Sequence, residues 1–391
     1  MKPEVTFYPV GNGDMTLIKL ESDVQILIDI NIRQPGDGIR DVASDLRRDV
    51  RRDDKGRPYV DVMVLSHPDQ DHCRGFEEHF HVGSISEYKD AEDFSKAKII
   101  IKEMWSSPLI FRRSNKKNHS LCSDAKAWAT EARRRVMLFR EGRVHVGDGD
   151  RIRIIGEDVD GKTDDIQQIV TKAGGTITTI ADRHHNNFSA YVIAPMLADD
   201  DNEDELLGKN ESSIIMNYSI GYSSTTEAAK FLSGGDAEVV IWEKVWEEHK
   251  GNVTPLQYNL MSTPHHCSWH TLSHDSSSEL KDKAKVSDDA LSALSQTLPG
   301  ATIVASSKEI LDNEDDPPSY RAKGEYVKIA KNANGEFWSV GSYLSPEQQT
   351  PLIFEVSTGG LKRIVRSTGS GAGGAGAGGA GLMGTTPLQH G

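Results

Sequence analysis

Short apolar stretches separated by turn residues open the chain. Residues 4–10, 15–20 and 24–30 are mostly apolar, and a Gly-Asn-Gly-Asp turn at 11–14 separates the first two. Runs of this length with turns between them predict strands that pair as antiparallel hairpins. A further apolar run at 60–66 predicts another strand, and residues 75–80 predict the beginning of a helix.

The rest of the chain alternates between strand-like and helix-like patterns. Apolar residues at helical spacing predict helices at 124–139, 238–249 and 288–298. Strand patterns occur at 151–155, 190–194, 213–220, 229–233, 256–261 and 301–305. Mixed strands and helices, with polar motifs repeatedly at strand ends, favour a layered α/β fold in the broad sense that includes α+β.

Two segments differ from this pattern. Residues 84–141 are polar and basic, and we interpret them as a helical insertion between core strands. Residues 366–391 are mostly glycine and alanine, a composition that cannot bury a core, and they predict a flexible tail. We therefore expect one domain over residues 1–365 that contains the insertion, followed by the tail.

Composition narrows the class of protein. The 391 residues are 37% hydrophobic and 27% charged, which is typical of a water-soluble globular protein. No apolar run has the length of a membrane span, and no charged-then-apolar leader opens the chain. We therefore expect a cytoplasmic protein without a membrane partner. Three cysteines exclude a disulfide framework.

The formal net charge of -14 works against sequence-independent binding to nucleic acid, which needs clustered lysine and arginine. The charge is unevenly distributed, however. Residues 199–205 are acidic, whereas basic residues cluster at 47–52 and within 112–135. The basic residues of the insertion are either ordinary solvated helix charges or a guide for a polyanion.

The densest group of reactive side chains follows the predicted strand at 60–66. It comprises His67, Asp69, Asp71 and His72. Imidazole and carboxylate ligands together suit a divalent ion that assists hydrolysis, and two such ions can share the set. The alternative is a polar turn in which Asp71 caps a helix. That alternative leaves the flanking histidines unexplained, so we favour metal binding.

Two later segments have the same form, a strand end followed by polar residues. In Gly234-Gly235-Asp236 the glycines allow a close backbone approach and the aspartate can bridge two metals, although an aspartate at a helix start is usually a cap. His265 and His266 follow the strand pattern at 256–261. They are either both ligands or a ligand and its neighbour, and a surface loop would explain such a pair about as often.

Taken in chain order, these segments resemble the metallo-β-lactamase superfamily, and within it the hydrolase domain of ComEC-type competence proteins. The resemblance spans about residues 4–345 without the insertion. It implies a four-layer αββα sandwich with a helical insertion. The matching segments are residues 8–14, Leu27-Ile28-Asp29, His67-x-Asp69-x-Asp71-His72, residues 210–213, 235–238 and 264–266, and Ala305-Ser306-Ser307.

The resemblance implies two divalent ions, zinc or manganese. His67, Asp69 and one of His265 and His266 would hold one ion, and Asp71 and His72 the other. Asp236 would bridge the two ions, and Asp71 and Asp236 would be essential for catalysis. The carboxylate at position 69 shifts the expected metal partly from zinc toward manganese.

The resemblance also implies supporting roles. Asp29, together with Asp14, would lie behind the ligands, with Asp29 orienting a ligand histidine. Ser306 and Ser307 would lie on the substrate side. Two departures from the family are Cys267, where relatives usually have glycine, and Asp316-Pro317-Pro318, where many carry a histidine-proline pair. The second departure removes a late histidine that would contact the substrate or donate a proton.

The expected reaction is hydrolysis of a phosphodiester, by a nuclease or another phosphodiesterase, with a metal-bridged hydroxide as the nucleophile. DNA and RNA are the candidate partners. A thioester or lactam hydrolase uses the same dinuclear core and is an alternative. A non-catalytic interaction module, tethered to a protein partner by its tail, is another, although complete ligand motifs argue against it.

Overall fold

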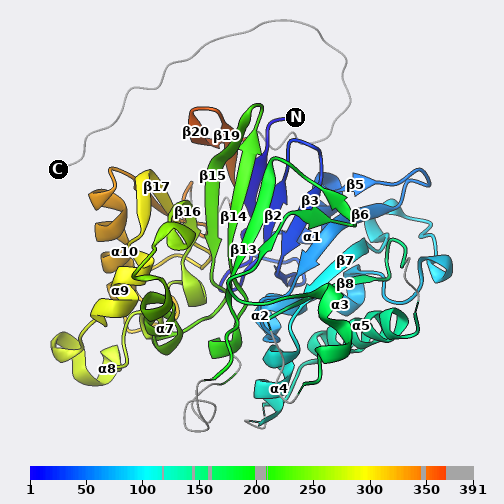
Figure 1. Cartoon of the computed structure of the whole chain (residues 1–391). Coiled ribbons are helices and arrows are strands. Elements are labelled where there is room, and N and C mark those ends of the chain that lie inside the picture. Colours follow the sequence, from blue (N-terminus) through cyan, green and yellow to red (C-terminus); the bar gives the residue numbers. More distant parts are fainter. Residues whose placement is uncertain are drawn as a thin grey trace, which may run out of the picture.

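Two β-sheets pack face to face at the centre of the molecule, and helices cover the outer face of each (Figure 1). The computed structural model describes residues 1–116, 119–142, 146–156, 161–198, 208, 210–344 and 349–366. The acidic segment 199–205 and the glycine- and alanine-rich residues 367–391 lie outside the described residues. The order of layers is helices, sheet, sheet, helices, so the predicted αββα fold class is confirmed.

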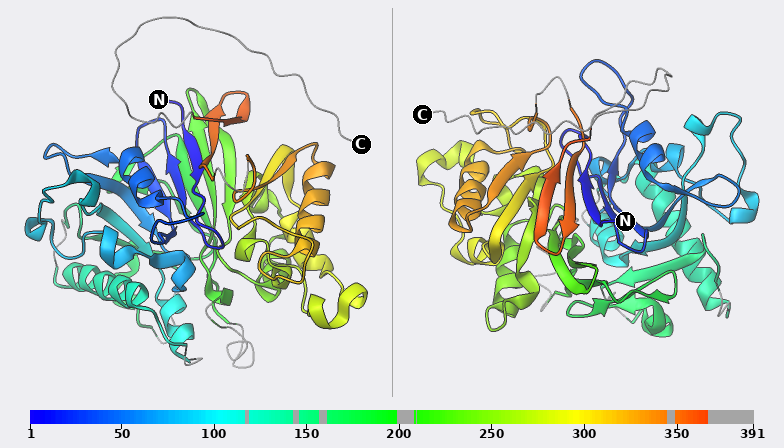
Figure 2. Two further views of the ribbon diagram at one scale, coloured as in Figure 1. Left: turned by 180° about the vertical axis from the view of Figure 1, so that it is seen from behind. Right: turned by 90° about the horizontal axis from the view of Figure 1, so that it is seen from above.

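The first sheet contains both ends of the described chain, in the order β20-β19-β1-β2-β3-β6-β7-β8-β9, and β5 pairs with β6. Strands β1, β2 and β3 are antiparallel, as the turn pattern predicts, whereas β6, β7 and β8 run parallel to β3. Figure 2 shows the N-terminal strands beside the C-terminal pair. The strands are β1 Glu4–Phe7, β2 Thr16–Lys19, β3 Gln25–Ile28, β5 Arg51–Arg52, β6 Pro58–Val64, β7 Ile100–Ser106, β8 Arg151–Ile155, β9 Val170–Thr171, β19 Leu352–Ser357 and β20 Gly360–Ile364.

The second sheet has the order β10-β13-β14-β15-β16-β17-β18. Its first half is antiparallel, and β15 to β18 are parallel. A two-stranded sheet of β11 (Thr179–Ile180) and β12 (Arg183–His184) lies apart from both. The strands are β10 Thr176–Ile177, β13 Phe188–Ala194, β14 Ile215–Tyr222, β15 Thr225–Ser233, β16 Tyr258–Ser262, β17 Thr297–Ala305 and β18 Glu336–Ser339.

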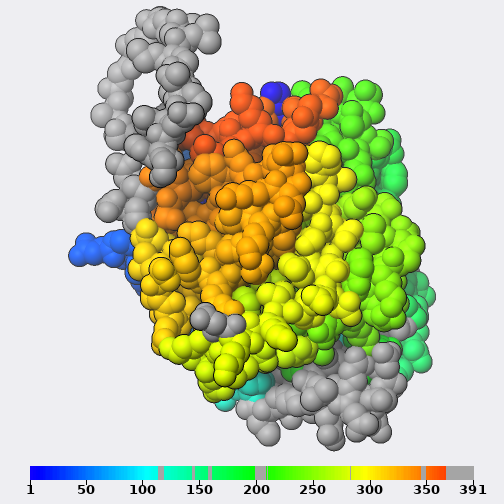
Figure 3. All heavy atoms as spheres, turned by 90° about the vertical axis from the view of Figure 1, so that its left-hand side faces the viewer, coloured from blue at the N-terminus to red at the C-terminus, as the bar shows by residue number. Residues whose placement is uncertain are grey.

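The helices divide into two groups, one on each outer face. Helices α1 to α5 cover the first sheet, and α7, α9 and α10 cover the second; Figure 3 views the molecule from the side of this second group. They are α1 Val42–Asp49, α2 Gln70–Cys73, α3 Phe76–His79, α4 Pro108–Lys116, α5 Ser123–Arg140, α7 Val239–His249, α8 Ser277–Leu280, α9 Asp288–Leu294 and α10 Tyr320–Asn332. Among the described residues, none of these helices combines the length and apolar character needed to cross a bilayer.

Strand alternation explains the layers. On β3, Ile26 and Ile28 face the second sheet, whereas Leu27 between them packs against the helices. Strands that are apolar on both faces must be covered on both, which a four-layer sandwich achieves. The two sheets meet through aromatic contacts such as Phe7 with Phe231, whose ring centroids lie 5.6 Å apart.

Residues 84–141 contribute more to the first sheet than a helical insertion suggests. Strand β7 lies within this range and pairs with β6 on one side and β8 on the other. Helix α5 buries Trp128 against α3 and the sheet. The polar composition of the range conceals β7, because its seven residues are flanked by charged loops.

Candidate metal centre

The site residues follow strands of both sheets at one edge of the sandwich. β3 and β6 are parallel with Ile28 opposite Val64, so Asp29 lies beside the segment that leads to His67. β15 and β16 are parallel with Leu232 opposite Met261. Since parallel strands end at the same edge, Asp236 and the histidines after β16 reach the same place.

Asp29 and Ser66 anchor the segment 67–72, which we call the first motif. Asp29 follows β3 with a φ of 53°, and its backbone N–H donates to the carbonyl of Val64 at 3.0 Å. Its carboxylate accepts a hydrogen bond from the backbone N–H of Ser66 at 2.7 Å. The other carboxylate oxygen lies 2.8 Å from His72 Nδ1. This contact directs His72 Nε2 toward the centre of the site, as a carboxylate behind a ligand histidine does.

The two carboxylate oxygens of Asp236 face two different sets of imidazoles. Oδ1 lies 2.9 Å from His72 Nε2 and 3.5 Å from His266 Nε2. Oδ2 lies 3.4 Å from His67 Nε2 and 3.6 Å from His265 Nε2. The carboxylate therefore stands between two groups of candidate ligands.

Asp69 lies in one of these groups and Asp71 lies in the other. Asp69 Oδ2 lies 3.8 Å from His67 Nε2, and Asp71 Oδ2 lies 3.4 Å from His266 Nε2. We call His67, Asp69 and His265 the His67 set, and His72, Asp71 and His266 the His72 set; Asp236 belongs to both. The sequence left open which of the two adjacent histidines is a ligand, and the structure places them in different sets.

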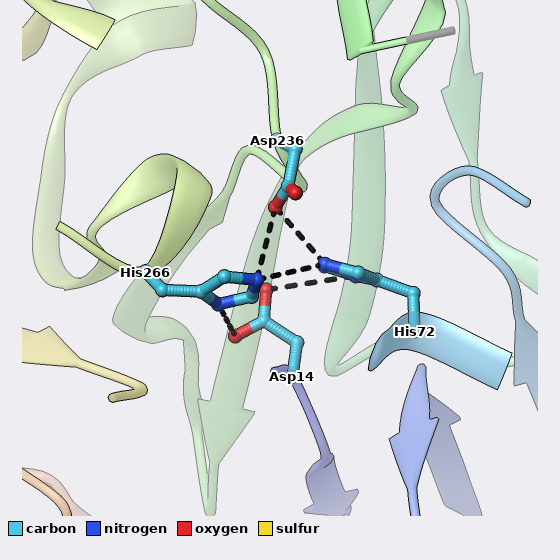
Figure 4. A group of neighbouring side chains, drawn as sticks. All are labelled: Asp14, His72, Asp236 and His266. Atoms are coloured by element: carbon cyan, nitrogen blue, oxygen red, sulfur yellow. Dashed lines mark hydrogen bonds and ion pairs between the residues drawn. The ribbon is translucent and has the colours of Figure 1, made fainter. Parts of the chain in front are cut away.

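Asp14 also reaches the His72 set. Asp14, His72, Asp236 and His266 are all buried, and one ligand atom from each lies within 4.8 Å of the others (Figure 4). We expected Asp14 behind the ligands, but its carboxylate lies close enough to be a ligand itself. In the sequence, Asp14 is marked only by its position at the end of the 11–14 turn. That position does not distinguish a metal ligand from a residue behind the ligands.

The charges of the centre are buried and coupled. Burial opposes a charged imidazole, but the carboxylates of Asp236 and Asp29 raise the pKa of His72 well above its usual value. Burial also lowers the pKa of His266, but the carboxylates of Asp236 and Asp71 outweigh burial and raise it. Conversely, the surrounding histidines lower the pKa of Asp236 despite its burial. In the metal-free protein these carboxylates therefore favour the protonated forms of His72 and His266.

Several nitrogen and oxygen atoms of the centre that could bind a metal have no hydrogen-bond partner within the described part of the chain. They include His67 Nε2 and Asp14 Oδ1, and both are buried. A buried polar atom without a partner is costly, and imidazole nitrogen and carboxylate oxygen are the atoms that divalent ions bind. The residues present therefore fit divalent metal ions.

Gly235 explains how Asp236 comes so close to the first motif. Its φ is 51°, and a Cβ at this position would lie 2.9 Å from Ser66 Cβ and 3.0 Å from Ser213 Cβ. Ser213 Oγ in turn accepts a hydrogen bond from the backbone N–H of Asp236 at 3.2 Å. Only glycine fits between the two serines, so this residue fixes the position of Asp236.

The backbone after β16 is strained where it presents the two histidines. His265, His266 and Cys267 have φ values of 50°, 52° and 70° in succession. Left-handed conformations are rare for residues with a Cβ and cluster at functional sites. Asp316 stabilises the following turn, accepting hydrogen bonds from Ser268 Oγ at 2.7 Å and from the Trp269 N–H at 3.0 Å.

Ser306 and Ser307 follow β17 near the same edge but do not join the group. Both are buried; Ser306 Oγ donates to the carbonyl of Gly13 at 2.7 Å, and Ser307 Oγ donates to that of Lys308 at 2.9 Å. Their hydroxyls thus support the 11–14 loop and the β17 end, and contact with a substrate stays a prediction.

Comparisons with known proteins add little to this geometry. No protein-family model matches the chain, and no curated protein matches it. Among solved structures, a mutant of CmlA beta-hydroxylase is similar with a TM-score of 0.34 and 9% identity, over 90% of this chain and 54% of that one. Unliganded yeast PDE1 is similar with a TM-score of 0.38 and 12% identity, over 86% of this chain and 96% of that one. The chain spans about half the length of the first of these. Scores this low do not establish a shared fold.

Proposed function

We propose that the chain is a metal-dependent hydrolase of the metallo-β-lactamase type with two divalent ions. The observation that carries the proposal is the position of Asp236, whose two carboxylate oxygens face two separate sets of ligand residues. A carboxylate shared in this way is what a dinuclear site requires. A polar turn with helix caps would have no reason to gather four imidazoles, three of them buried, around one aspartate.

Each residue of the centre has a role in this proposal. The His67 set and the His72 set would each hold one ion, with Asp236 between them. Carboxylates in both sets make the site suitable for zinc or manganese. When bound, two such ions activate water and stabilise the negative charge that develops during hydrolysis. Asp29 keeps His72 oriented, and Gly235 and Ser213 keep Asp236 in place.

We propose a phosphodiester as the substrate, from the order of motifs along the chain. Three arginines of α5 do not support a guide for a polyanion, because each is paired with a carboxylate. Arg134 and Arg135 both pair with Glu131 at 2.7 Å, and Arg140 pairs with Asp165 at the same distance. These three arginines already face carboxylates of the protein, so they attract a phosphodiester less than unpaired arginines would. A thioester or lactam substrate is the second candidate, because the same dinuclear centre serves acyl transfer.

A substrate panel tests the proposal. Purified protein, loaded with zinc or manganese, is assayed with a chromogenic phosphodiester, single-stranded and duplex DNA, a thioester and a lactam, beside Asp71→Ala. We expect metal-dependent cleavage of phosphodiesters that Asp71→Ala abolishes. Cleavage of the acyl substrates alone would favour the second candidate. Tightly bound metal without any turnover would contradict both, and absence of bound metal would favour an interaction module.

A further inference from the structure

Two arginines lie beside the candidate metal centre. Arg74 ends helix α2, two residues after His72, and Arg33 follows the short strand β4 (Ile30–Asn31). The two segments run side by side, with Asn31 bridged to Arg74 and the backbone N–H of Ile32 donating to the carbonyl of Arg74 at 2.9 Å. The backbone therefore holds the two arginines next to each other.

Neither arginine has an anionic partner within the residues that the structure describes. Both side chains are partly buried, and the Nε atom of each is buried without a hydrogen-bond partner. Arg134, which is also partly buried, pairs with Glu131 at 2.7 Å. Burial, and then the positive charge of Arg74, lower the pKa of Arg33, but a guanidinium stays charged at neutral pH. Two adjacent, half-buried cations without counter-charge are costly unless an anion binds them.

The 11–14 loop connects this pair to the metal centre. A Cβ on Gly11, whose φ is 79°, would lie 2.9 Å from Arg33 Nη2 and 3.1 Å from its Cζ, so the guanidinium lies against the loop backbone. The same loop ends at Asp14, whose N–H donates to the carbonyl of Asp71 at 3.2 Å. Asn31 holds the loop through its side-chain amide, which donates to the carbonyl of Asn12 at 2.9 Å. One loop thus contacts Arg33 at its beginning and the ligand residues at its end.

We propose that Arg33 and Arg74 together bind a second phosphate group of the substrate, next to the phosphodiester that is hydrolysed. The inference rests on the proposed function and narrows its substrate class to phosphodiesters that carry another phosphate, such as a nucleotide chain. A guanidinium offers a planar fork of donors that matches phosphate oxygens, and two forks suit a dianion better than a single carboxylate. Arg33 and Arg74 would also attract a polyanion, which the arginines of α5 that face carboxylates do not.

Kinetics on matched substrates test the proposal. Dithymidylates with no terminal phosphate, a 5′-phosphate or a 3′-phosphate are assayed with the metal-loaded wild type, Arg33→Gln/Arg74→Gln and Arg183→Gln. Arg183 is an exposed arginine on β12 and serves as the matched control. We expect the wild type and Arg183→Gln to prefer one phosphorylated substrate by about 10- to 100-fold in kcat/KM, and the double variant to lose this preference. A preference that persists in the double variant, or is absent from the wild type, would overturn the proposal.

A binding measurement separates failure of this inference from failure of the proposed function. Calorimetric titration of the same three metal-loaded proteins with inorganic phosphate needs no turnover. We expect the double variant to bind phosphate about 10-fold or more weakly than the wild type and Arg183→Gln. Equal affinity in all three would overturn the arginine site even if phosphodiesters are cleaved. Weakened binding without cleavage of any substrate would support the site and contradict the phosphodiesterase.

Discussion

The carboxylate of Asp29 lies 2.8 Å from Nδ1 of His72, and both side chains are buried at the junction of β3 and α2. The contact leaves only Nε2 of this histidine to face Asp236. It thereby sets the direction in which His72 can bind a metal.

Replacing Asp29→Asn keeps the size of the side chain and removes its charge. We expect the affinity for zinc or manganese to fall about 10- to 100-fold, because partners of a ligand histidine set its orientation and basicity. Competition with a chelating dye measures the affinity. Asp61→Asn is the matched control, since Asp61 is also a buried aspartate of this sheet and accepts a hydrogen bond from the Gln25 N–H at 3.0 Å. Equal losses in both variants would contradict a specific role for Asp29.

Gly235→Ala should destabilise the protein and weaken metal binding together. The new Cβ would meet Ser66 and Ser213 at about 3 Å in a left-handed conformation, which forces the Asp236 loop to shift. We expect a loss of about 1–3 kcal/mol in the free energy of unfolding, measured with urea. Gly251→Ala, whose Cβ would meet nothing within 4 Å, should change stability by less than about 0.5 kcal/mol. Similar losses in the two variants would contradict the packing described for Gly235.

Metal affinity should rise with pH. In the metal-free protein, burial opposes protonation, but Asp236 and Asp29 raise the pKa of His72 well above 6.5, so a metal must displace a proton to bind. The raised pKa also means that His72 stabilises the metal-free fold below pH 6.5 and that this contribution is lost as the pH rises through the folded-state pKa. Titrations of metal binding and urea unfolding at several pH values measure both trends. Affinity that does not change with pH would contradict the charge coupling.

Cys122 should be the first thiol to react. Its Sγ lies 3.6 Å from that of Cys73. The hydrogen bond with Cys73 lowers the pKa of Cys122 to about 6, although its partial burial opposes this, whereas the same hydrogen bond and burial raise the pKa of Cys73. Mass spectrometry after brief iodoacetamide treatment at pH 7 should find the label at Cys122, ahead of the buried Cys73 and Cys267. Earlier labelling of Cys73 would contradict this order.

The sequence predicted elements best where apolar runs are bounded by turns. The strand pattern at 151–155 coincides with β8, and the helix pattern at 238–249 differs from α7 by one residue. Helices α1 and α10 were missed because their apolar residues are interspersed with many charged ones. Strand β7 was missed because the composition of a longer range outweighed its seven residues.

The site residues likewise divide into those that the sequence predicted and those that only the structure revealed. Clustered histidines and aspartates after one strand could be recognised without a structure. The separation of His265 from His266 could not, since it depends on two successive left-handed residues that no local preference predicts. The pairing of Arg33 with Arg74 depends on contact between segments far apart in the chain, and neither residue stands out in the sequence.

The central claim is that Asp236 joins two metal sites, and the metal content of purified protein tests it most directly. Elemental analysis after loading with manganese or zinc and removal of the excess should find about two ions per chain in the wild type. Asp236→Ala should retain less than about one, because both sets lose a shared ligand, whereas His265→Ala should retain about one, in the His72 set. One ion in the wild type, or two in Asp236→Ala, would contradict a dinuclear centre built around this carboxylate.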